Sequence, residues 1–515
     1  MPSDRPDILI YEKPEDRKTG RQAAGRTSTE DTRKDSMQKN VIVIGAGAAG
    51  LMAAAAAAEQ GSKVTVLEKN EKAGKKIYIT GKGRCNLTND CATEEFFGYV
   101  ARNHKFLYSA VYGFDHEMVK DFFEKNGCPV KVERGGRVFP VSDHASDVTA
   151  ALLRRLQKSG VRIMYHTTVS AILTQAPSWE KGPADAGSGP AQETETAVSK
   201  KKKGRLTQSG MVRGVRLQNG QELPADAVIV CTGGLSYPST GSDGSGLKMA
   251  RQLGLEVTPT APSLVPFETR EIWCRDLQGL ALKNVSVSIF PNEDDTGEEG
   301  GAAEVETPDG AQGRKKKKSR SKKPVYQAFG ELLFTHFGLS GPIILTASCY
   351  CDFSKYPGGF RLYLNLKPAL SQEQLEERLH REFEKAPDRH LPGAVRPLFP
   401  ARLAEVVTQL SGLDPQRRAA SFTETEIRAL AALIQALPVT VTGTRGYSEA
   451  IITRGGISVR EFDPSTMESR RIRGLFAAGE VLDVDAQTGG FNLQIAWSTG
   501  RLAGLNAGAE TESDT

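Results

Sequence analysis

The clearest regular pattern of hydrophobic and polar residues lies at residues 40–70, which read NVIVIGAGAAGLMAAAAAAEQGSKVTVLEKN. Residues 41–44 form a short apolar run rich in β-branched residues, which is typical of a buried strand. An alanine-rich stretch follows and predicts a helix, and residues 64–67 predict a second, parallel strand. A strand, a helix and a parallel strand in this order favour an α/β fold that binds a nucleotide.

The turn between the first strand and the helix has the spacing G-x-G-x-x-G. Gly45 permits the tight turn, Gly47 leaves room for a phosphate to approach the backbone, and Gly50 lets the helix lie close to the strand. Glu68 ends the second strand, near the ~20-residue offset at which an acid accepts ribose hydroxyls. The alternative is a glycine-rich turn of purely structural use. The predicted dinucleotide-binding residues of this segment are Gly45, Ala46, Gly47, Ala48, Gly50, Glu68 and Lys69.

Three segments interrupt the regular pattern, at residues 1–39, 174–208 and 291–323. They are rich in charged and small residues and poor in large apolar ones, so the first is predicted to be a mobile extension. The other two are predicted to be solvated insertions at hairpin tips. Both close with runs of Lys and Arg, and the alternative is that these runs contact the phosphates of a nucleic acid.

Later strands of the same domain also end in residues suited to a ligand. The apolar run at residues 226–231 leads directly into Thr232, Gly233 and Gly234, which permit close approach of the backbone to a ligand. A β-rich stretch near Val169 would bring backbone groups beside the adenine. Residues 74–89, GKKIYITGKGRCNLTN, have no periodic apolar pattern and predict a loop. Its donors and glycines suit a polar heterocycle or a phosphate, with a basic surface turn as the alternative, and its candidate residues are Gly81, Arg84, Cys85 and Asn86.

A second glycine-to-helix junction lies near the C-terminus. Residues 475–478 predict a strand that leads into Gly479 and Glu480, and a glycine pair then opens a long helix. A strand, an acid and a helix N-terminus together form a site for an anion and a polar ring. Two such junctions at opposite ends of the chain imply one nucleotide-binding domain built from both ends. The candidate residues of this junction are Gly479, Glu480, Gly489, Gly490, Asn492 and Leu493.

The inserted domain is predicted at residues 262–442, between a first part of the nucleotide-binding domain at 40–261 and a second part at 443–515. Its first half reads as strands that suggest a β-barrel, and residues 370–437 are rich in helical pattern. The Gly341-Pro342 step is predicted to end a strand and start a helix at Pro342. His336 stands between two aromatic residues, either as a proton donor or as a packed structural residue.

Composition places few limits on this picture. The 515 residues exceed what one core serves, and 39% hydrophobic residues with a net charge of +5 are ordinary for a soluble protein. Seven cysteines without a C-x-x-C pair favour reduced thiols in the cytoplasm, and Cys349 and Cys351 lack the further ligands of a metal site. No run approaches the ~18 apolar residues of a membrane span, and no signal peptide is evident.

Four blocks in order, VIVIGAGAAGLMAA, TGKGRCNLTN, ELLFTHFGLSGP and MESRRIRGLFAAGEVLDVDAQTGGFNLQIAWSTG, resemble the BaiN-like family of FAD-dependent oxidoreductases over residues 40–507. The resemblance implies an α/β, Rossmann-like FAD-binding domain built from both chain ends, with an inserted β-barrel plus helical cap domain. It also implies that the first glycine turn and Glu68 hold the ADP half of FAD. The second and fourth blocks would lie at the flavin and the ribityl chain, and Thr232 to Gly234 would lie beside the dinucleotide.

In this family a flavin carries the hydride, while a side-chain acid protonates the neighbouring carbon of the substrate. Cys85 is the first candidate, because Arg84 and the glycine-rich loop would favour its thiolate, and its alternative role is packing under the ring. Tyr237 and His336 are the other candidates. No second strand-linked glycine motif is present for NAD(P)H, so a reduced nicotinamide is expected to bind transiently against the flavin.

The resemblance implies two kinds of substrate. The first, which we favour, is an unsaturated 3-oxo bile acid or steroid, an apolar small molecule whose ring double bonds are reduced. The second is a uracil of ribosomal RNA, reduced to dihydrouridine, which the basic insertions favour slightly. A hypothesis of another class is a flavin-bound RNA-binding factor without catalytic turnover.

Overall fold

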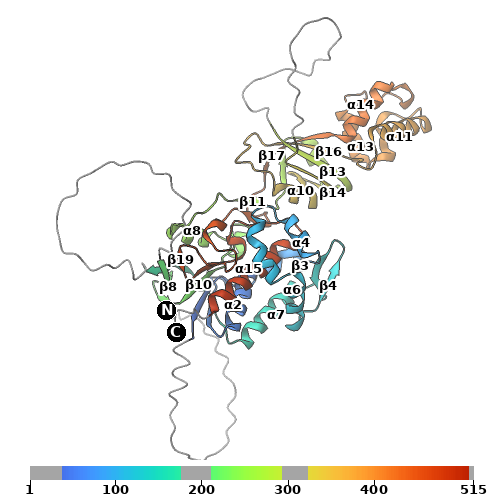
Figure 1. Ribbon diagram of the computed structural model, residues 1–515. Helices are drawn as coiled ribbons and strands as arrows, with labels where there is room; N and C mark the ends of the chain where they lie inside the picture. Colours follow the sequence, from blue (N-terminus) through green and yellow to red (C-terminus); the bar gives the residue numbers. More distant parts are fainter. Residues whose placement is uncertain (1–37, 176–209, 293–322, 510–515) are drawn as a thin grey trace, which may run out of the picture. The chain divides into compact units, whose positions relative to one another are not determined.

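The computed structural model describes most of the chain (Figure 1), namely residues 38–175, 210–292 and 323–509. The predicted extension at residues 1–39 and the predicted insertions at 174–208 and 291–323 lie almost entirely outside the described residues. The chain forms two compact units. Unit 1 comprises Met1–Ala261 and Ile452–Thr515, and unit 2 comprises Pro262–Ile451.

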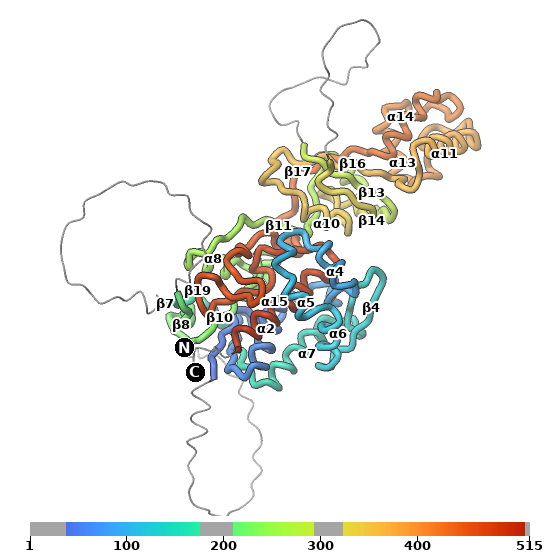
Figure 2. The backbone as a smooth tube through the Cα atoms, in the orientation of Figure 1, coloured from blue at the N-terminus to red at the C-terminus, as the bar shows by residue number. Residues whose placement is uncertain are grey.

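Unit 1 is built around a parallel sheet of five strands in the order β20-β10-β1-β2-β6. The inner strands β1 and β10 are short runs of mostly buried, mostly β-branched residues, as expected for a sheet covered on both faces. Strand β20 comes from the C-terminal part of the chain, and Figure 2 shows the red C-terminal trace running among the blue and green segments of this unit. The prediction of one Rossmann-like domain built from both chain ends is therefore confirmed. The strands are β1 (Asn40–Ile44), β2 (Lys63–Leu67), β6 (Arg162–Met164), β10 (Ala227–Val230) and β20 (Leu475–Ala477).

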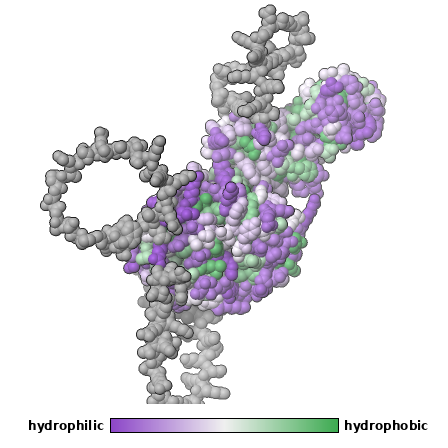
Figure 3. Space-filling model, viewed as in Figure 1, coloured by the Kyte–Doolittle hydropathy of each residue, from purple (hydrophilic) through white to green (hydrophobic). Residues whose placement is uncertain are grey.

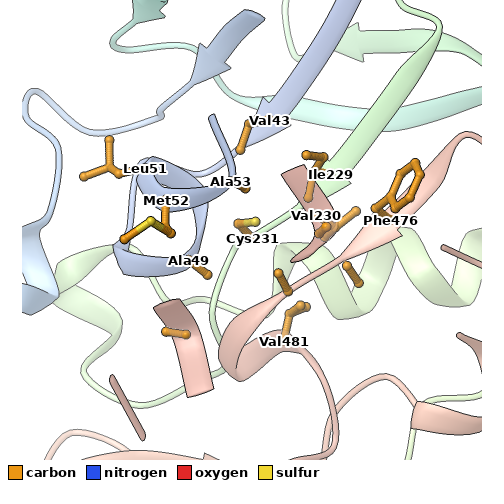
Figure 4. Close-up of a cluster of buried hydrophobic side chains, with 14 of the residues drawn as sticks. Val43, Ala49, Leu51, Met52, Ala53, Ile229, Val230, Cys231, Phe476 and Val481 are labelled. Carbon is orange, nitrogen blue, oxygen red and sulfur yellow. The ribbon is translucent and has the colours of Figure 1, made fainter. Parts of the chain in front are cut away.

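Helices α2 (Ala48–Glu59) and α15 (Phe491–Gly508) pack against each other with unusually small residues between them. A Cβ atom added to Gly500 or to Gly504 would overlap the carbonyl oxygen of Ala49 or Ala53 in α2. The four-residue spacing of these glycines places them on one face of α15, so the two backbones approach along successive turns. Figure 4 shows the alanine side chains of α2 beside the apolar residues of β1, β10 and β20.

The remaining elements of unit 1 include two smaller sheets, with strand orders β3-β5-β4 and β19-β8-β7. The prediction of a loop throughout residues 74–89 is wrong at α3 (Lys75–Ile79), a one-turn helix that buries Ile77. The other strands are β3 (Thr88–Asn89), β4 (Val130–Glu133), β5 (Arg137–Pro140), β7 (Val169–Gln175), β8 (Gly210–Leu217), β9 (Glu222–Pro224), β18 (Ile452–Arg454) and β19 (Ile472–Arg473). The other α-helices are α4 (Thr93–Phe96), α5 (Tyr108–Gly113), α6 (His116–Lys125), α7 (Ala145–Lys158) and α8 (Ser245–Gln252).

Unit 2 contains a closed antiparallel barrel in the order β12-β15-β14-β13-β16-β17. Closure leaves no strand edge exposed, and inward-facing apolar residues of every strand form its core. The predicted barrel is confirmed, and α10 (Pro342–Ser348) begins at Pro342 as the sequence predicts. The barrel strands are β12 (Phe267–Thr269), β13 (Ala281–Pro291), β14 (Tyr326–Thr335), β15 (Gly338–Ser340), β16 (Phe360–Asn365) and β17 (Leu437–Thr444). Strand β11 (Ala261–Ser263) and helix α9 (Ile272–Asp276) precede β13.

A cluster of helices lies between β16 and β17 in the chain, as the helical pattern of residues 370–437 predicts. Leu375, Leu379 and Phe383 are buried on one face of α11, against the other helices. Strand β17 runs to Thr444 and pairs Gly443 with Glu268 inside the barrel, so the barrel extends past the boundary placed after Thr442. The helices are α11 (Gln372–Lys385), α12 (Leu391–Val395), α13 (Ala401–Leu410) and α14 (Glu424–Gln435).

Among the helices of the described residues, none is both long enough and apolar enough to cross a bilayer. The face shown in Figure 3 carries hydrophilic residues over most of the helical region of unit 2, in keeping with this result.

Candidate functional site

The glycine loop, residues 45–50, connects β1 to α2 in unit 1. Gly45 has a φ angle of +100°, and a Cβ atom there would lie 2.6 Å from the carbonyl oxygen of Cys231. A Cβ atom on Gly50 would overlap the carbonyl oxygen of Gly45. Gly47 differs, because no atom lies within 4 Å of the position of its Cβ. Two of the glycines are therefore enclosed by backbone, while the third borders open space of the kind that a phosphate needs.

The N-terminus of α2 lies at this open space. Gly47 is its N-cap residue, no side chain caps its N–H groups, and no acidic residue stands in its first turn. The unpaired N–H groups and the positive end of the helix dipole favour an anion at this position. The glycine loop therefore has the open space and the helix-end charge that suit a phosphate.

Glu68 supports the glycine loop from the end of β2. Its side chain is 7% exposed, and its Oε2 atom accepts a hydrogen bond of 2.8 Å from the backbone N–H of Ala46. Its Oε1 atom accepts from the backbone N–H and the side-chain amide of Asn70, at 2.8 and 2.7 Å. Lys69 points to Asp243, with 2.6 Å between the ammonium nitrogen and the carboxylate. The predicted acid is therefore held in one orientation beside the loop, and sequence reasoning missed Asn70 and Asp243.

Six buried side-chain polar atoms have no hydrogen-bond partner among the described residues, and two of them belong to predicted site residues. They are Oγ1 of Thr232, two residues after the end of β10, and Oδ1 of Asn86, in the cysteine loop at residues 80–86. Buried polar atoms in folded proteins nearly always have partners, so these two oxygens retain hydrogen-bonding capacity for a ligand. Gly233 next to Thr232 has a φ angle of +70°, and Val169 is the buried first residue of β7. These segments fit a polar ligand such as a dinucleotide.

The C-terminal junction lies against α2 and β3. Gly479 has a φ angle of +75°, and a Cβ atom there would lie 2.8 Å from the Cβ atom of Ala49. Gly490, with φ at +101°, packs against the carbonyl of Thr88, and the ring of Phe491 lies beside Gly489. The glycines of this junction therefore allow close packing of backbone segments.

Two side chains of the same junction have structural partners. The side-chain amide of Asn492 makes two hydrogen bonds with the backbone of Ala486. Its Oδ1 atom accepts from the N–H of Ala486 at 2.9 Å, and its Nδ2 atom donates to the carbonyl oxygen of Ala486 at 2.8 Å. Leu493 is partly buried against the core of unit 1. The side chain of Asn492 thus holds the preceding loop, whereas the carboxylate of Glu480 binds three donors that are described below.

The cysteine loop, residues 80–86, does not have the electrostatics that the sequence suggests. The Nε atom of Arg84 lies 2.8 Å from Asp143, its guanidinium also pairs with Glu133, and it stacks on Phe139 at 4.1 Å from the ring centroid. Cys85 is fully buried, and burial raises the pKa of its thiol to about 12. The prediction of a Cys85 thiolate favoured by Arg84 is therefore wrong, because burial disfavours the thiolate and Arg84 pairs with two carboxylates instead. The buried position of Cys85 matches its alternative role in packing.

The two other candidate acids lie in different units. Tyr237 is half-buried in unit 1, after the Thr232 turn, with a φ angle of +51°. His336 lies at the tip of the tight β14–β15 hairpin in unit 2, is exposed, and has its ring 4.8 Å from that of Phe337. The exposure of His336 contradicts the packed structural role that was its alternative. Roles in proton transfer stay predictions for both residues.

Unit 1 contains two other groupings of charged residues, apart from the glycine loop. A cleft of about 510 Å³ lies near Glu59, at the opposite end of α2 from the glycine loop. Two of its cations, Arg155 and Arg501, pair with Glu59 at 3.0 and 3.1 Å, so these two charges already have a partner within the protein. Asp90, His116 and Glu117 lie close enough to share a metal ion, but the ammonium of Lys120 occupies both carboxylates. In both groupings these charged side chains are already paired with one another, so the glycine loop is the stronger candidate site.

The sequence matches a known protein family and several characterised relatives. The family described as HI0933-like protein Rossmann domain matches residues 39–181 and 189–506. A ribosomal RNA dihydrouridine synthase from Escherichia coli is 30% identical over 89% of this chain and 96% of its own length. A 3-dehydro-bile acid delta(4,6)-reductase from Clostridium scindens is 28% identical over 90% of this chain and 98% of its own length.

Solved structures add little to this result. The 3-ketosteroid-delta4-(5alpha)-dehydrogenase of Rhodococcus jostii RHA1 is 16% identical, covering 92% of this chain and 97% of that chain, with a TM-score of 0.43. A likeness of this degree carries no argument about function. The family match and the relatives agree with the four motif blocks, and the resemblance stated from them is confirmed. The chain belongs to the HI0933-like family of Rossmann-domain proteins.

Proposed function

We propose that this protein is an FAD-dependent reductase that adds hydrogen to an activated C=C bond. The observation that carries the proposal is the glycine loop, in which Gly45 and Gly50 are closed by backbone while Gly47 faces open space at the N-terminus of α2. When bound, FAD supplies the hydride-transfer chemistry that the side chains of the protein lack. The protein binds and orients the cofactor and substrate and supplies a proton.

The residues around the loop would hold successive parts of FAD. The N-terminus of α2 would bind the pyrophosphate, and Glu68 would accept hydroxyls of the adenine ribose. The unpaired oxygens of Thr232 and Asn86 would gain partners from the cofactor. Glu480, beside Gly479, would meet the ribityl chain.

The reaction class is supported by the relatives. Dihydrouridine is uridine whose C5=C6 bond has been reduced, and a delta(4,6)-reductase acts on double bonds of a ring. In both cases a hydride is added to one carbon of a C=C bond and a proton to its neighbour. The chain is accordingly an oxidoreductase of CH–CH groups, and we propose NADH or NADPH as the electron donor.

The proton must come from a neutral or cationic acid near the substrate. Cys85 keeps its proton at neutral pH, because burial raises its pKa to about 12, and this makes it a poor proton donor as well as a poor nucleophile. Tyr237, directly after the Thr232 turn, and the exposed His336 are the candidates that we carry forward.

The identity of the substrate is proposed from chemistry and relatives together. We propose an unsaturated 3-oxo steroid, the first of the two substrates that the resemblance implies, because one relative is a reductase of such a compound. The second candidate is a uracil of ribosomal RNA, which two relatives favour, at 30% and 28% identity. A flavin-bound RNA-binding factor without turnover is the candidate of another class.

One experiment separates these candidates. The purified flavoprotein is reduced anaerobically with NADH or NADPH and then mixed with a 3-oxo-4-ene steroid or with ribosomal RNA that lacks dihydrouridine. Rapid reoxidation of the flavin by the steroid supports the favoured substrate, and reoxidation by the RNA supports the second. If neither substrate reoxidises the flavin and neither nicotinamide reduces it, the reductase proposal is wrong.

A further inference from the structure

Lys76 contacts two residues that border the proposed cofactor site, although no motif of the sequence singled it out. It lies in α3, and its Nζ atom is 2.6 Å from Oε2 of Glu480 and 2.6 Å from Oγ of Ser236. The side chains of Lys76 and Glu480 are only 22% and 20% exposed, so this ion pair is partly shielded from water. The pair joins positions 404 residues apart in the chain.

The carboxylate of Glu480 is held on both oxygens. Oε1 accepts a hydrogen bond of 2.7 Å from the hydroxyl of Ser236 and one of 2.8 Å from the backbone N–H of Thr453. Since an ammonium group only donates, Ser236 accepts from Lys76 and must direct its own proton to Glu480. The network therefore has one consistent direction for every hydrogen, and it fixes the Glu480 carboxylate in one orientation.

This network adjoins the glycine loop on two sides. The backbone N–H of Gly74, just before α3, donates to the carbonyl of Ala46 at 2.8 Å, which ties α3 to the loop. Gly479, next to Glu480, packs on Ala49 in the first turn of α2. Glu480 thus carries a negative charge on the residue next to one that packs against the first turn of α2, the turn that would receive the two negative charges of the FAD pyrophosphate.

We propose that Lys76 is a positioning residue of the cofactor site, which neutralises and orients the Glu480 carboxylate so that FAD binds tightly. The inference rests on the proposed function, since it concerns the same cofactor. Without the ammonium group, the carboxylate would repel the pyrophosphate and would rotate away from its fixed orientation. Lys76 therefore acts on FAD through Glu480 and needs no contact with the flavin.

The test measures FAD binding to the apoprotein, by quenching of flavin fluorescence, with no substrate present. Lys76→Met is expected to weaken FAD binding about tenfold, and Lys76→Arg, which keeps the charge, is expected to recover most of the loss. Lys75→Met is the matched control, because the neighbouring Lys75 pairs with the exposed Glu71 at 3.3 Å, and it should bind FAD as the wild type does. Unchanged FAD affinity in Lys76→Met would overturn the inference.

A double-mutant cycle tests whether Lys76 acts through Glu480. In the Glu480→Gln background the carboxylate is already absent, so Lys76→Met should change FAD affinity less than twofold. A full tenfold loss in that background would mean that Lys76 acts directly or through folding, and would overturn the inference. If Lys76→Met does not fold, Lys76→Arg and Lys76→Gln decide the matter: binding near wild type for Arg with about tenfold weaker binding for Gln supports the inference, and equal binding overturns it.

The wild-type apoprotein separates this inference from the proposed function. If the wild type binds FAD and the variants behave as the wild type does, only the role of Lys76 is wrong. If the wild type itself binds no FAD, both the proposed function and the inference are overturned. Thermal unfolding of each apoprotein shows whether a loss of binding reflects a loss of folded protein, because a positioning role predicts melting temperatures close to that of Lys75→Met.

Discussion

The glycine loop and the cysteine loop of unit 1 are held in place by different kinds of interaction. In the glycine loop, Gly45 and Gly50 stand where a Cβ atom would meet the backbone of Cys231 or of Gly45 itself. In the cysteine loop, Arg84 is held by ion pairs with Glu133 and Asp143, which come from β4 and from the segment before α7. The first loop is fixed by excluded volume and the second by charges that the fold brings together.

This difference determines how each loop should respond to change. The repulsion between backbone atoms rises steeply as the distance between them falls and does not depend on pH, so a substitution at an enclosed glycine acts on folding. Ion pairs that are partly exposed contribute little to stability and depend on pH and salt. Substitutions in the cysteine loop should therefore change the free energy of unfolding only slightly, and by an amount that varies with pH. The predictions below follow this order, from the enclosed glycines to the ion pairs.

Gly50→Ala should have the largest effect. The added methyl group would overlap the carbonyl oxygen of Gly45, and neither backbone can move while α2 packs on α15. We expect little soluble protein, or a loss of about 3 kcal/mol in the free energy of unfolding. Yield and urea unfolding measure this, with Gly98→Ala as the control, since nothing lies within 4 Å of that position. A Gly50→Ala protein as stable as the control would show that the loop is not enclosed.

Gly47→Val should leave the fold intact and abolish the cofactor. Gly47 has an extended backbone, with φ at −82°, and free space around its Cβ position, so a side chain costs little in the apoprotein. The same side chain would fill the space proposed for the pyrophosphate, and FAD affinity should fall at least about 100-fold, or ~2.7 kcal/mol. Colourless protein with a normal apoprotein melting temperature is the expected result. Full FAD occupancy in this variant would refute the phosphate site.

The glycine loop could be predicted from the sequence because its causes are local. The apolar run before it, the alanine-rich helix and Glu68 all lie within residues 40–70, so pattern and spacing were enough. The barrel was predictable for a similar reason, since inward-facing residues alternate along its strands. In both cases a residue's environment depends mainly on its neighbours in the chain.

The cysteine loop could not be predicted in the same way. The sequence shows Arg84 next to Cys85, but it does not show that Glu133 and Asp143 take up the charge of the arginine. The network of Lys76, Ser236 and Glu480 was missed for the same reason, since its members come from three distant segments. The chemistry of a charged side chain depends on partners that only the fold supplies.

Cys85 should behave as a buried, unreactive thiol. Its pKa of about 12 leaves a thiolate fraction of about 10⁻⁴ at pH 8, and its side chain is fully buried. Iodoacetamide at pH 8 should therefore modify the half-buried Cys91 before Cys85 in the native protein, as followed by peptide mass spectrometry. Cys85→Ala should retain FAD and lose about 1 kcal/mol of stability from the cavity that it leaves. Rapid labelling of native Cys85, or loss of turnover with FAD retained, would restore it as a catalytic candidate.

Arg84→Met should have the smallest effect, and one that depends on pH. Arg84 lowers the pKa of Glu133, and Lys131 together with Arg84 lowers that of Asp143. A carboxyl group whose pKa is lower in the folded protein stabilises the fold above its unfolded pKa, near 4.5 for Glu133 and 3.8 for Asp143, and this contribution is lost as the pH falls further. The stability difference between wild type and variant should therefore be constant above about pH 5 and shrink towards pH 3.

Urea midpoints measured from pH 7 down to pH 3 test this last expectation. Lys125→Met is a suitable control, because it removes an ion pair with Asp121 whose side chains are 74% and 57% exposed, and such pairs contribute little at any pH. A difference that persisted unchanged at pH 3 would mean that Arg84 holds the cysteine loop through its stacking on Phe139 rather than through its ion pairs. Both loops would then be held in place mainly by packing, and the contrast between excluded volume and charge would not hold.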